Sequence, residues 1–256
     1  MCLILIAVDA HPDFKLVLAA NRDEYYERPS APPSFWEEAP EILAGRDLAA
    51  GGTWLGITRH GRIAAITNYR DPASTKPNAP SRGHLVSDFL LGRASPSDYL
   101  EAVSRESARY NGFNLLVGER HRLLWTSNRS DRRVALSPGI YGVSNHLLDT
   151  PWPKVLRAKA LFQEIIHAGG HLSVESLFQL LKDQTPAPDD QLPSTGVPLE
   201  WERILSPIFI TSPTYGTRSS TVLLIDKEDH VTFLDRTFNG HPEPVSTSEF
   251  EFVLEP

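Results

Sequence analysis

The sequence is poor in the features that would place it outside a reducing, aqueous compartment. It has one cysteine in 256 residues, so no disulfide can form within the chain. No apolar run reaches the ~18 residues that a membrane-spanning helix needs. The apolar residues 1–8 follow no basic segment and end at Asp9, so we expect no secretory signal and a cytoplasmic location.

Positive charge is also scarce, and the familiar catalytic motifs are missing. Acidic residues outnumber basic ones by 32 to 25, which gives a net charge of −7 and disfavours a nucleic-acid partner. The chain has no P-loop and no GxGxxG, HExxH, GxSxG or CxxC motif, so nucleotide-binding folds, zinc peptidases and serine hydrolases lack support. We therefore expect no cofactor and no metal site.

The single cysteine is Cys2, which directly follows the initiator methionine. A residue this small at position 2 permits removal of Met1, and the new N-terminus would carry both an α-amino group and a thiol. These groups have ordinary pKa values near ~7.7–8.0 and ~8.5, so the amine can accept the proton of the thiol close to neutral pH. The alternative is a buried cysteine in the first strand, which is common for free cysteines.

The pattern of apolar residues predicts strands at both ends of the chain and helices between them. Hairpins are expected from residues 1–8 with 15–21, within residues 51–71, and from residues 113–118 with 123–127. Further strands are expected over residues 207–212, 220–226, 230–238 and 249–254. Helices are expected over residues 84–91, 98–110, 153–167 and 173–182. Residues 28–40 and 185–198 are rich in proline and are expected to form loops, the second long enough to be a lid.

This order of elements predicts an α+β fold in which antiparallel sheets are covered by helices. With 41% hydrophobic and 22% charged residues the composition is that of a globular protein, and the length suits one large domain. We find no internal repeat and no break in composition. We therefore expect a single domain over residues 1–256.

Functional polar residues gather at four places where apolar strands begin or end. These are Asn21–Glu24, Thr67–Arg70, Tyr141–His146 and Tyr215–Thr221. In a regular strand successive side chains alternate, so Asn21 and Asp23 should share one face and Arg22 and Glu24 the other. Taken singly, each such residue is more often a turn or surface residue than a catalytic one.

Taken together, the four places fit thiol-based acyl transfer. Attack by a thiolate on an amide or ester creates an oxyanion, and losing one donor to it typically costs ~2.7–4 kcal/mol of barrier. An arginine beside the thiol lowers its pKa, and an aspartate can accept a hydrogen bond from the α-amino group. The sequence offers asparagine, arginine and aspartate side chains for these tasks.

The segments NRDEYYERPS and GGTWLGI, together with Met-Cys at the start and TN–R later, resemble the NRDE family. This family is also called the transport-and-Golgi-organisation protein 2 family, and the resemblance runs along most of the chain. It implies an N-terminal-nucleophile hydrolase-like fold, a four-layer αββα sandwich. Family members have been connected with lipid or acyl-CoA metabolism and with haem handling, and not with one settled reaction.

A more distant resemblance is to cysteine amidases of the choloylglycine hydrolase and penicillin V acylase type. It implies catalytic roles, in chain order, for Cys2, Arg22, Asp23, Asn68, Asn145 and Arg218. In those amidases the arginine and aspartate are separated, whereas here they are adjacent and should point apart. Around this group we expect substrate-binding roles for Asn21, Glu24, Trp54, Tyr69 and His146.

Two hypotheses follow. In the first, the chain is a cysteine N-terminal-nucleophile amidohydrolase or acyltransferase acting on a small-molecule amide or thioester, a non-peptide C–N bond in the amide case, through an acyl-Cys2 intermediate. In the second, it is a non-catalytic carrier that binds acyl-CoA, a lipid-like ligand or haem in the same cavity, with Cys2 and His146 as candidate haem ligands. A carrier needs no free amine, so it would bind its ligand with Met1 still attached.

Overall fold

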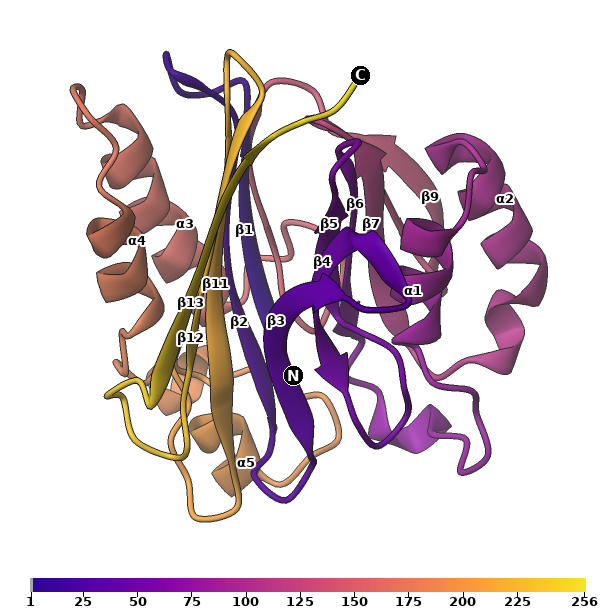
Figure 1. Ribbon diagram of the computed structural model, residues 1–256. Helices are drawn as coiled ribbons and strands as arrows, with labels where there is room; N and C mark the ends of the chain where they lie inside the picture. Colours follow the sequence, from indigo (N-terminus) through magenta and orange to yellow (C-terminus); the bar gives the residue numbers. More distant parts are fainter. Residues whose placement is uncertain (1) are drawn as a thin grey trace.

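Two antiparallel β-sheets lie face to face in the middle of the molecule, and helices cover the outer face of each (Figure 1). The computed structural model describes residues 2–256, so the predicted removal of Met1 lies outside the described residues. Helices and sheets together form the layers of an αββα sandwich. The predicted fold class is confirmed.

The first sheet has six strands in the order β10-β1-β2-β11-β12-β13. Its members are β1 (Cys2–Val8), β2 (Phe14–Tyr25), β10 (Gly139–Val143), β11 (Tyr215–Asp226), β12 (His230–Thr237) and β13 (Ser246–Val253). Strands from the two ends of the chain thus meet, because β2 pairs with β11 along its length. Strand β1 is buried on both faces, which explains its continuous apolar sequence.

The second sheet has seven strands, each paired with the next one along the chain. They are β3 (Ser30–Trp36), β4 (Ala39–Asp47), β5 (Leu55–Thr58), β6 (Arg62–Asn68), β7 (Phe113–Glu119), β8 (Arg122–Ser127) and β9 (Ser130–Ala135). The two predicted hairpins in this region, β5–β6 and β7–β8, are confirmed. Gly61 closes the first of them with φ of 83°, a conformation that glycine adopts without strain.

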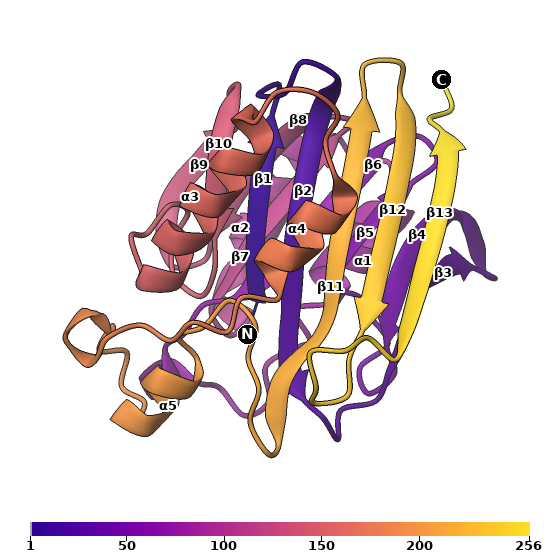
Figure 2. The ribbon, with the colours of Figure 1, turned by 90° about the vertical axis from the view of Figure 1, so that its left-hand side faces the viewer.

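Two pairs of helices form the outer layers. Helices α3 (Pro153–His167) and α4 (Val174–Leu181) cross the outer face of the six-stranded sheet (Figure 2). Helices α1 (His84–Leu91) and α2 (Pro96–Glu106) cover the seven-stranded sheet. All four were predicted, although α2 ends four residues before the expected Tyr110. The connections contain η1 (Pro72–Ser74), η2 (Ser107–Arg109), η3 (Asp189–Gln191) and α5 (Leu199–Ile204), which the sequence did not indicate. Within residues 2–256, no helix is long and apolar enough to cross a membrane.

The core follows from the alternation of side chains along the strands. On β1, Ile4 and Ile6 face the other sheet, whereas Leu3 and Leu5 face helices α3 and α4. A separate cluster holds α1 and α2 against the second sheet. Each strand at the centre of the first sheet therefore has one face toward the second sheet and one toward the helices. The face on which a side chain lies decides whether it is near Cys2.

Two predictions about local structure were wrong. The proline-rich residues 28–40 contain β3 and the start of β4, where a loop was expected. Strand β3 lies at the edge of its sheet, and its register shifts around Pro32 and Pro33, so the missing N–H groups cost no ladder hydrogen bonds. Residues 207–212 were predicted to be a strand, but they form an irregular segment, buried over 208–210, with one isolated bridge from Thr211 to Gly216.

Candidate active site

Cys2 begins strand β1 and faces the space between the two sheets. It continues the row of Ile4 and Ile6 on that face, and only 7% of its surface is exposed. A cavity of about 470 Å³ opens beside it, between strands of both sheets. The single cysteine is therefore buried, but it lines a space large enough for a small substrate.

The tetrad Asn21–Glu24 lies on β2, directly beside Cys2. Cys2 is the register partner of Arg22, so the two side chains share the face toward the cavity. Arg22 and Glu24 line the cavity. Among residues 2–256, no hydrogen bond or ion pair holds the Arg22 guanidinium, which leaves it available to the thiol or to a substrate.

Asn21 points away from the cavity, toward the helical layer. Its side-chain amide donates to the carbonyl oxygens of Leu181, at 2.8 Å, and Ile208, at 3.0 Å. Its side-chain oxygen accepts a hydrogen bond of 2.6 Å from Ser220. With 0% exposure and these partners, Asn21 ties β2 to the end of α4 and is not placed to touch a substrate.

The Asp23 side chain lies on the same face as that of Asn21, although Asp23 is also one of the residues that line the cavity. Its carboxylate accepts a hydrogen bond of 2.8 Å from Thr217. Burial raises the pKa of the Asp23 carboxyl, and the nearby Lys154 ammonium opposes that rise. Adjacent arginine and aspartate therefore do point to opposite faces, and the strand does not break between them.

Lys154 is the unusual partner in this arrangement. It lies in the first turn of α3, it is 4% exposed, and its ammonium has no hydrogen-bond partner among the described residues. Burial lowers the pKa of Lys154 to about 8, although Asp23 favours the charged form. Nothing in the sequence pointed to Lys154, because a single lysine after a proline at the start of a helix is usually exposed.

The two predicted asparagines lie together behind Cys2. The Asn145 side chain donates to the backbone oxygen of Asn68 at 2.9 Å, and Ser144 donates to the backbone oxygen of Cys2 at 2.9 Å. Asn68 lines the cavity, and its own side-chain amide has no hydrogen-bond partner among residues 2–256. Asn145 thus holds Asn68 in place, whereas Asn68 can donate to an oxyanion.

Arg218 also lines the cavity, at a shift in the pairing of β11 with β2. Its guanidinium donates to the carbonyl oxygens of Tyr25 at 2.8 Å and of Tyr26 and Arg28, each at 3.1 Å. These bonds fix the turn between β2 and β3. Arg218 therefore shapes the cavity wall, and part of its hydrogen-bonding capacity is already used.

The remaining predicted residues divide between the cavity and its surroundings. Trp54 and Glu24 line the cavity, and Glu24 accepts a hydrogen bond of 2.9 Å from the Tyr25 amide. The rings of Tyr69 and His146 contact each other with centroids 4.8 Å apart and do not line it. His146 Nδ1 lies 2.8 Å from the hydroxyl of Thr150, and burial lowers the pKa of its ring.

Among the cavity residues that the sequence did not suggest, two charged ones stand out, Arg82 and Asp235. Arg82, in the loop before α1, donates to the carbonyl oxygen of Gly112 at 2.9 Å, and its charge interacts with Cys2. Asp235, on β12, is 2% exposed and lines the cavity. A signal for Asp235 existed, since it replaces an apolar residue on the buried side of an alternating strand.

The electrostatics of the thiol follow from its burial. Burial raises the pKa of Cys2, and the positive charge of Arg22 and the Asp23 backbone amide act against that rise. A buried thiol does not ionise freely, so its reaction needs a base that removes the proton as the thiol attacks. The α-amino group of a processed Cys2 would be such a base.

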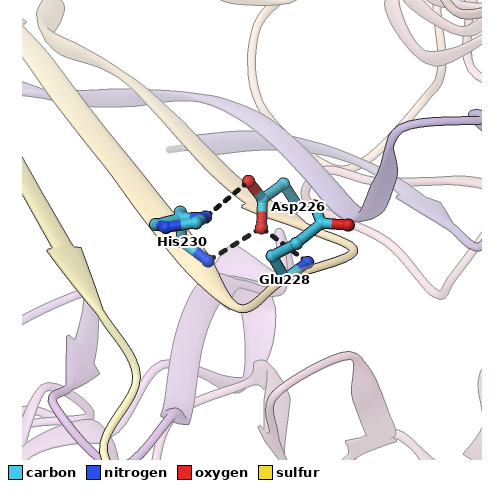
Figure 3. Close-up of side chains that lie close together, drawn as sticks. All are labelled: Asp226, Glu228 and His230. Carbon is cyan, nitrogen blue, oxygen red and sulfur yellow. Dashed lines mark hydrogen bonds and ion pairs between the residues drawn. The ribbon is translucent and has the colours of Figure 1, made fainter.

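One cluster of potential metal ligands occurs among the described residues, and it lies away from this site. Asp226, Glu228 and His230 stand at the β11–β12 turn, at the opposite end of the sheet from Cys2 (Figure 3). Asp226 Oδ1 accepts from the backbone amides of Glu228 and His230, at 2.9 and 2.8 Å. The carboxylate therefore serves the turn itself, and we assign no metal site to it.

The architecture is similar to that of solved acylases. An N-acylethanolamine-hydrolyzing acid amidase ortholog from Caenorhabditis elegans superposes with a TM-score of 0.52 at 12% identity, covering 97% of this chain and 100% of that chain. A mutant of the conjugated bile acid hydrolase from Clostridium perfringens gives 0.56 at 9% identity, covering 98% and 92%. At such low identities the similarity shows a shared N-terminal-nucleophile hydrolase-like fold.

Similarity in sequence is stronger. The chain is 38% identical over 276 residues to the Transport and Golgi organization protein 2 homolog of Bos taurus, and 37% identical over 279 residues to that of Homo sapiens, with complete coverage of each. The Drosophila melanogaster protein is 31% identical, covering 94% of this chain and 93% of its own. The family model for Transport and Golgi organisation 2 matches residues 1–240. The chain therefore belongs to the Transport and Golgi organisation 2 family.

Proposed function

We propose that this chain is a cysteine N-terminal-nucleophile amidohydrolase or acyltransferase that acts on a small amide or thioester. The observation that carries the proposal is the position of Cys2, which begins β1 and faces a cavity of about 470 Å³. It shares that face with Arg22, whose guanidinium has no partner among the described residues. The fold shared with solved acylases supports it. The expected cytoplasmic location and the roles of individual residues belong to the same proposal.

The first step is the transfer of an acyl group to Cys2. Its sulfur attacks the substrate carbonyl carbon, a C–S bond forms, and the α-amino group of the processed chain takes the thiol proton. Asn68 donates a hydrogen bond to the oxyanion, and Arg22 stabilises negative charge on sulfur and oxygen. The intermediate then collapses, the C–N bond of an amide or the C–S bond of a thioester breaks, and the leaving group takes the proton.

The second step releases the acyl group. Water attacks the acyl-Cys2 carbonyl and yields an acid, or another nucleophile accepts the acyl group and yields a transferase product. In both cases the α-amino group takes the proton of the attacking group, and Cys2 leaves as a thiol. Asp23, buried on the other face with the Lys154 charge nearby, acts as the acceptor that orients the α-amino group.

The carrier hypothesis remains the alternative outcome of the test. The cavity wall carries several charged side chains, among them Arg22, Arg82 and Asp235. A lipid tail or a haem ring is matched better by an apolar wall, because uncompensated burial of charge is costly. The lining thus favours a polar substrate over a lipid-like cargo.

The decisive experiment measures the mass of the intact protein before and after brief treatment with iodoacetamide. Because the chain has one cysteine, a single added group reports on Cys2 alone. Loss of Met1 and fast labelling are expected. A panel of amides and thioesters is then tested with the wild type and with Cys2→Ala, and the acyl-enzyme is sought as an added mass.

Cys2→Ala is expected to abolish turnover and acyl-enzyme formation without a change in thermal stability. Cys2→Ser, which keeps the shape of the site, serves as the matched control for the nucleophile. If the panel is turned over equally by Cys2→Ala, the proposed chemistry is wrong. If Met1 is retained and a ligand binds stoichiometrically without turnover, the carrier hypothesis replaces it.

A further inference from the structure

The cavity has two ends of opposite electrical character. At the Cys2 end, Arg22 shares the face of the thiol and the charge of Arg82 interacts with it. At the other end, on β12, the wall contains Asp235 with Phe233 and Thr237 beside it. The proposed reaction uses the first end only, so the acidic end has no role in it.

Three hydroxyl groups surround Asp235. Thr221 donates to one carboxylate oxygen at 2.6 Å, and Thr237 lies 3.5 Å from the other. Ser219 is the register partner of Thr237, and its hydroxyl acts to lower the pKa of this carboxyl. All three hydroxyl-bearing residues line the cavity together with Asp235, and Thr221 and Asp235 are the most buried of the four, at 1% and 2% exposure.

The direction of these hydrogen bonds fixes what the wall can offer a ligand. A hydroxyl group has one proton to donate and two lone pairs that accept. Because the protons point toward Asp235, the lone pairs are what remains for the cavity. The wall therefore accepts hydrogen bonds from a ligand and cannot easily donate to one.

Other cations of the cavity do not cancel this preference. Arg28 is bound to Asp47 at 2.6 Å, and Arg46 is paired with Glu38. Arg218 donates to three backbone carbonyls. Burial raises the pKa of Asp235 to about 6, so the carboxyl is mainly ionised at neutral pH, and Arg22 is the cation whose charge reaches it.

We propose that Ser219, Thr221, Thr237 and Asp235 form a subsite for a hydrogen-bond-donating group, an ammonium above all, at the far end of the substrate from the carbonyl that Cys2 attacks. This inference rests on the proposed function and deepens it by naming the substrate class: an acyl compound with a polar, donating terminus.

Sheet register gives the length of that substrate. From Cys2 the register crosses β1, β2, β11 and β12 to Thr237, the subsite residue level with Cys2, which is three steps between neighbouring strands. At about 4.8 Å for each step, the two ends lie about 14 Å apart. An extended chain of roughly ten to twelve bonds spans that distance.

The test uses chloroacetamides, which alkylate a thiol and so report occupancy of the cavity through the intact mass. Each carries a linear chain of about four, eight or twelve atoms that ends in an ammonium, a hydroxyl, a methyl or a carboxylate group. The longest ammonium probe is expected to label Cys2 about tenfold faster than its methyl counterpart, the range for a hydrogen bond to a charged group. The hydroxyl probe should fall between them, and the carboxylate probe should be slowest.

Asp235→Asn should reduce the ratio of the ammonium to the methyl labelling rate to near one, because the asparagine amide adds a hydrogen-bond donor to the wall. Thr237→Val, which removes one acceptor at the same shape, should weaken it several-fold. Thr232→Val is the matched control, since Thr232 lies on the opposite face of β12 and should keep the wild-type ratio. An unchanged ratio in Asp235→Asn, or faster labelling by the carboxylate or methyl probe in the wild type, would overturn the subsite.

A second measurement separates this inference from the proposed function. Non-reactive acetamide analogues of the same probes are titrated calorimetrically into Cys2→Ala protein. Tighter binding of the ammonium analogue is expected there too, even if the thiol proves inert and the proposed chemistry fails. Equal binding of all four analogues would refute the subsite while leaving Cys2 chemistry untouched.

Discussion

The two faces of β2 beside Cys2 differ in what they do. On the cavity face, Arg22 is accessible and has no fixed partner among the described residues. On the helix face, Asn21 and Asp23 are almost completely buried and bound to α4, β11 and the segment around Ile208. The four consecutive polar residues thus form two pairs. Arg22 and Glu24 can contact a substrate, whereas Asn21 and Asp23 anchor the sheet and place an acidic group on its buried face.

The largest effect should come from breaking the helix face. Asn21→Ala would leave two buried carbonyl oxygens and the Ser220 hydroxyl without their partner. We expect a loss of about 2–4 kcal/mol in the free energy of unfolding, measured by urea denaturation. Folded Asn21→Ala protein should still be alkylated at Cys2 at the wild-type rate. Slower alkylation with an unchanged free energy of unfolding would mean that Asn21 acts on the cavity face, against this assignment of the two faces.

A somewhat smaller effect is expected from Asp235, with a definite dependence on pH. Its folded pKa of about 6 lies above its ordinary value of 3.8, so the folded state holds the proton more tightly and ionisation of the buried carboxyl costs stability above pH 6. Asp235→Asn removes that cost and should stabilise the protein by about 2–3 kcal/mol at pH 7.

The advantage of Asp235→Asn should shrink as the pH falls from 6 toward 4, because the folded-state carboxyl takes up its proton in this range, whereas the unfolded-state carboxyl does so only around its ordinary pKa of 3.8. Urea denaturation of both proteins at pH 4, 5, 6 and 7 gives the difference directly. A difference that grows toward low pH would mean that the carboxylate is stabilised by its hydroxyl partners more than burial disfavours it.

On the cavity face, the change should appear in reactivity and not in stability. Arg22→Gln removes a positive charge beside the thiol, so the thiolate is less favoured and alkylation at pH 7 should slow roughly three- to tenfold. The free energy of unfolding should stay within about 0.5 kcal/mol of the wild type. Arg122→Gln, on the exposed side of β8, is the control and should alter neither quantity.

These comparisons show which parts of the site the sequence could predict. Alternation along β2 correctly separated Arg22 from Asp23, because the pairing of β1 and β2 is local and continuous. Lys154 and Asp235 were missed because they approach the site through α3 and β12, and β12 is brought there by the pairing of β2 with β11, two segments far apart in the chain. Tyr69 and His146 were expected to bind substrate because their neighbours Asn68 and Asn145 match the amidase pattern, yet neither ring reaches the cavity.

The smallest effect should therefore come from Tyr69. Its ring lies against His146 outside the cavity, and its backbone amide, which donates to the Gly112 carbonyl at 2.9 Å, is unaffected by a change of side chain. Tyr69→Phe should change the rate of Cys2 alkylation by less than about twofold and the free energy of unfolding by less than about 0.5 kcal/mol. Comparison with Arg22→Gln in the same labelling assay sets the scale. If Tyr69→Phe slowed Cys2 alkylation as much as Arg22→Gln, the path of the reagent to Cys2 would have to extend past Asn68 to the Tyr69–His146 pair. The functional surface would then include residues outside the present cavity lining.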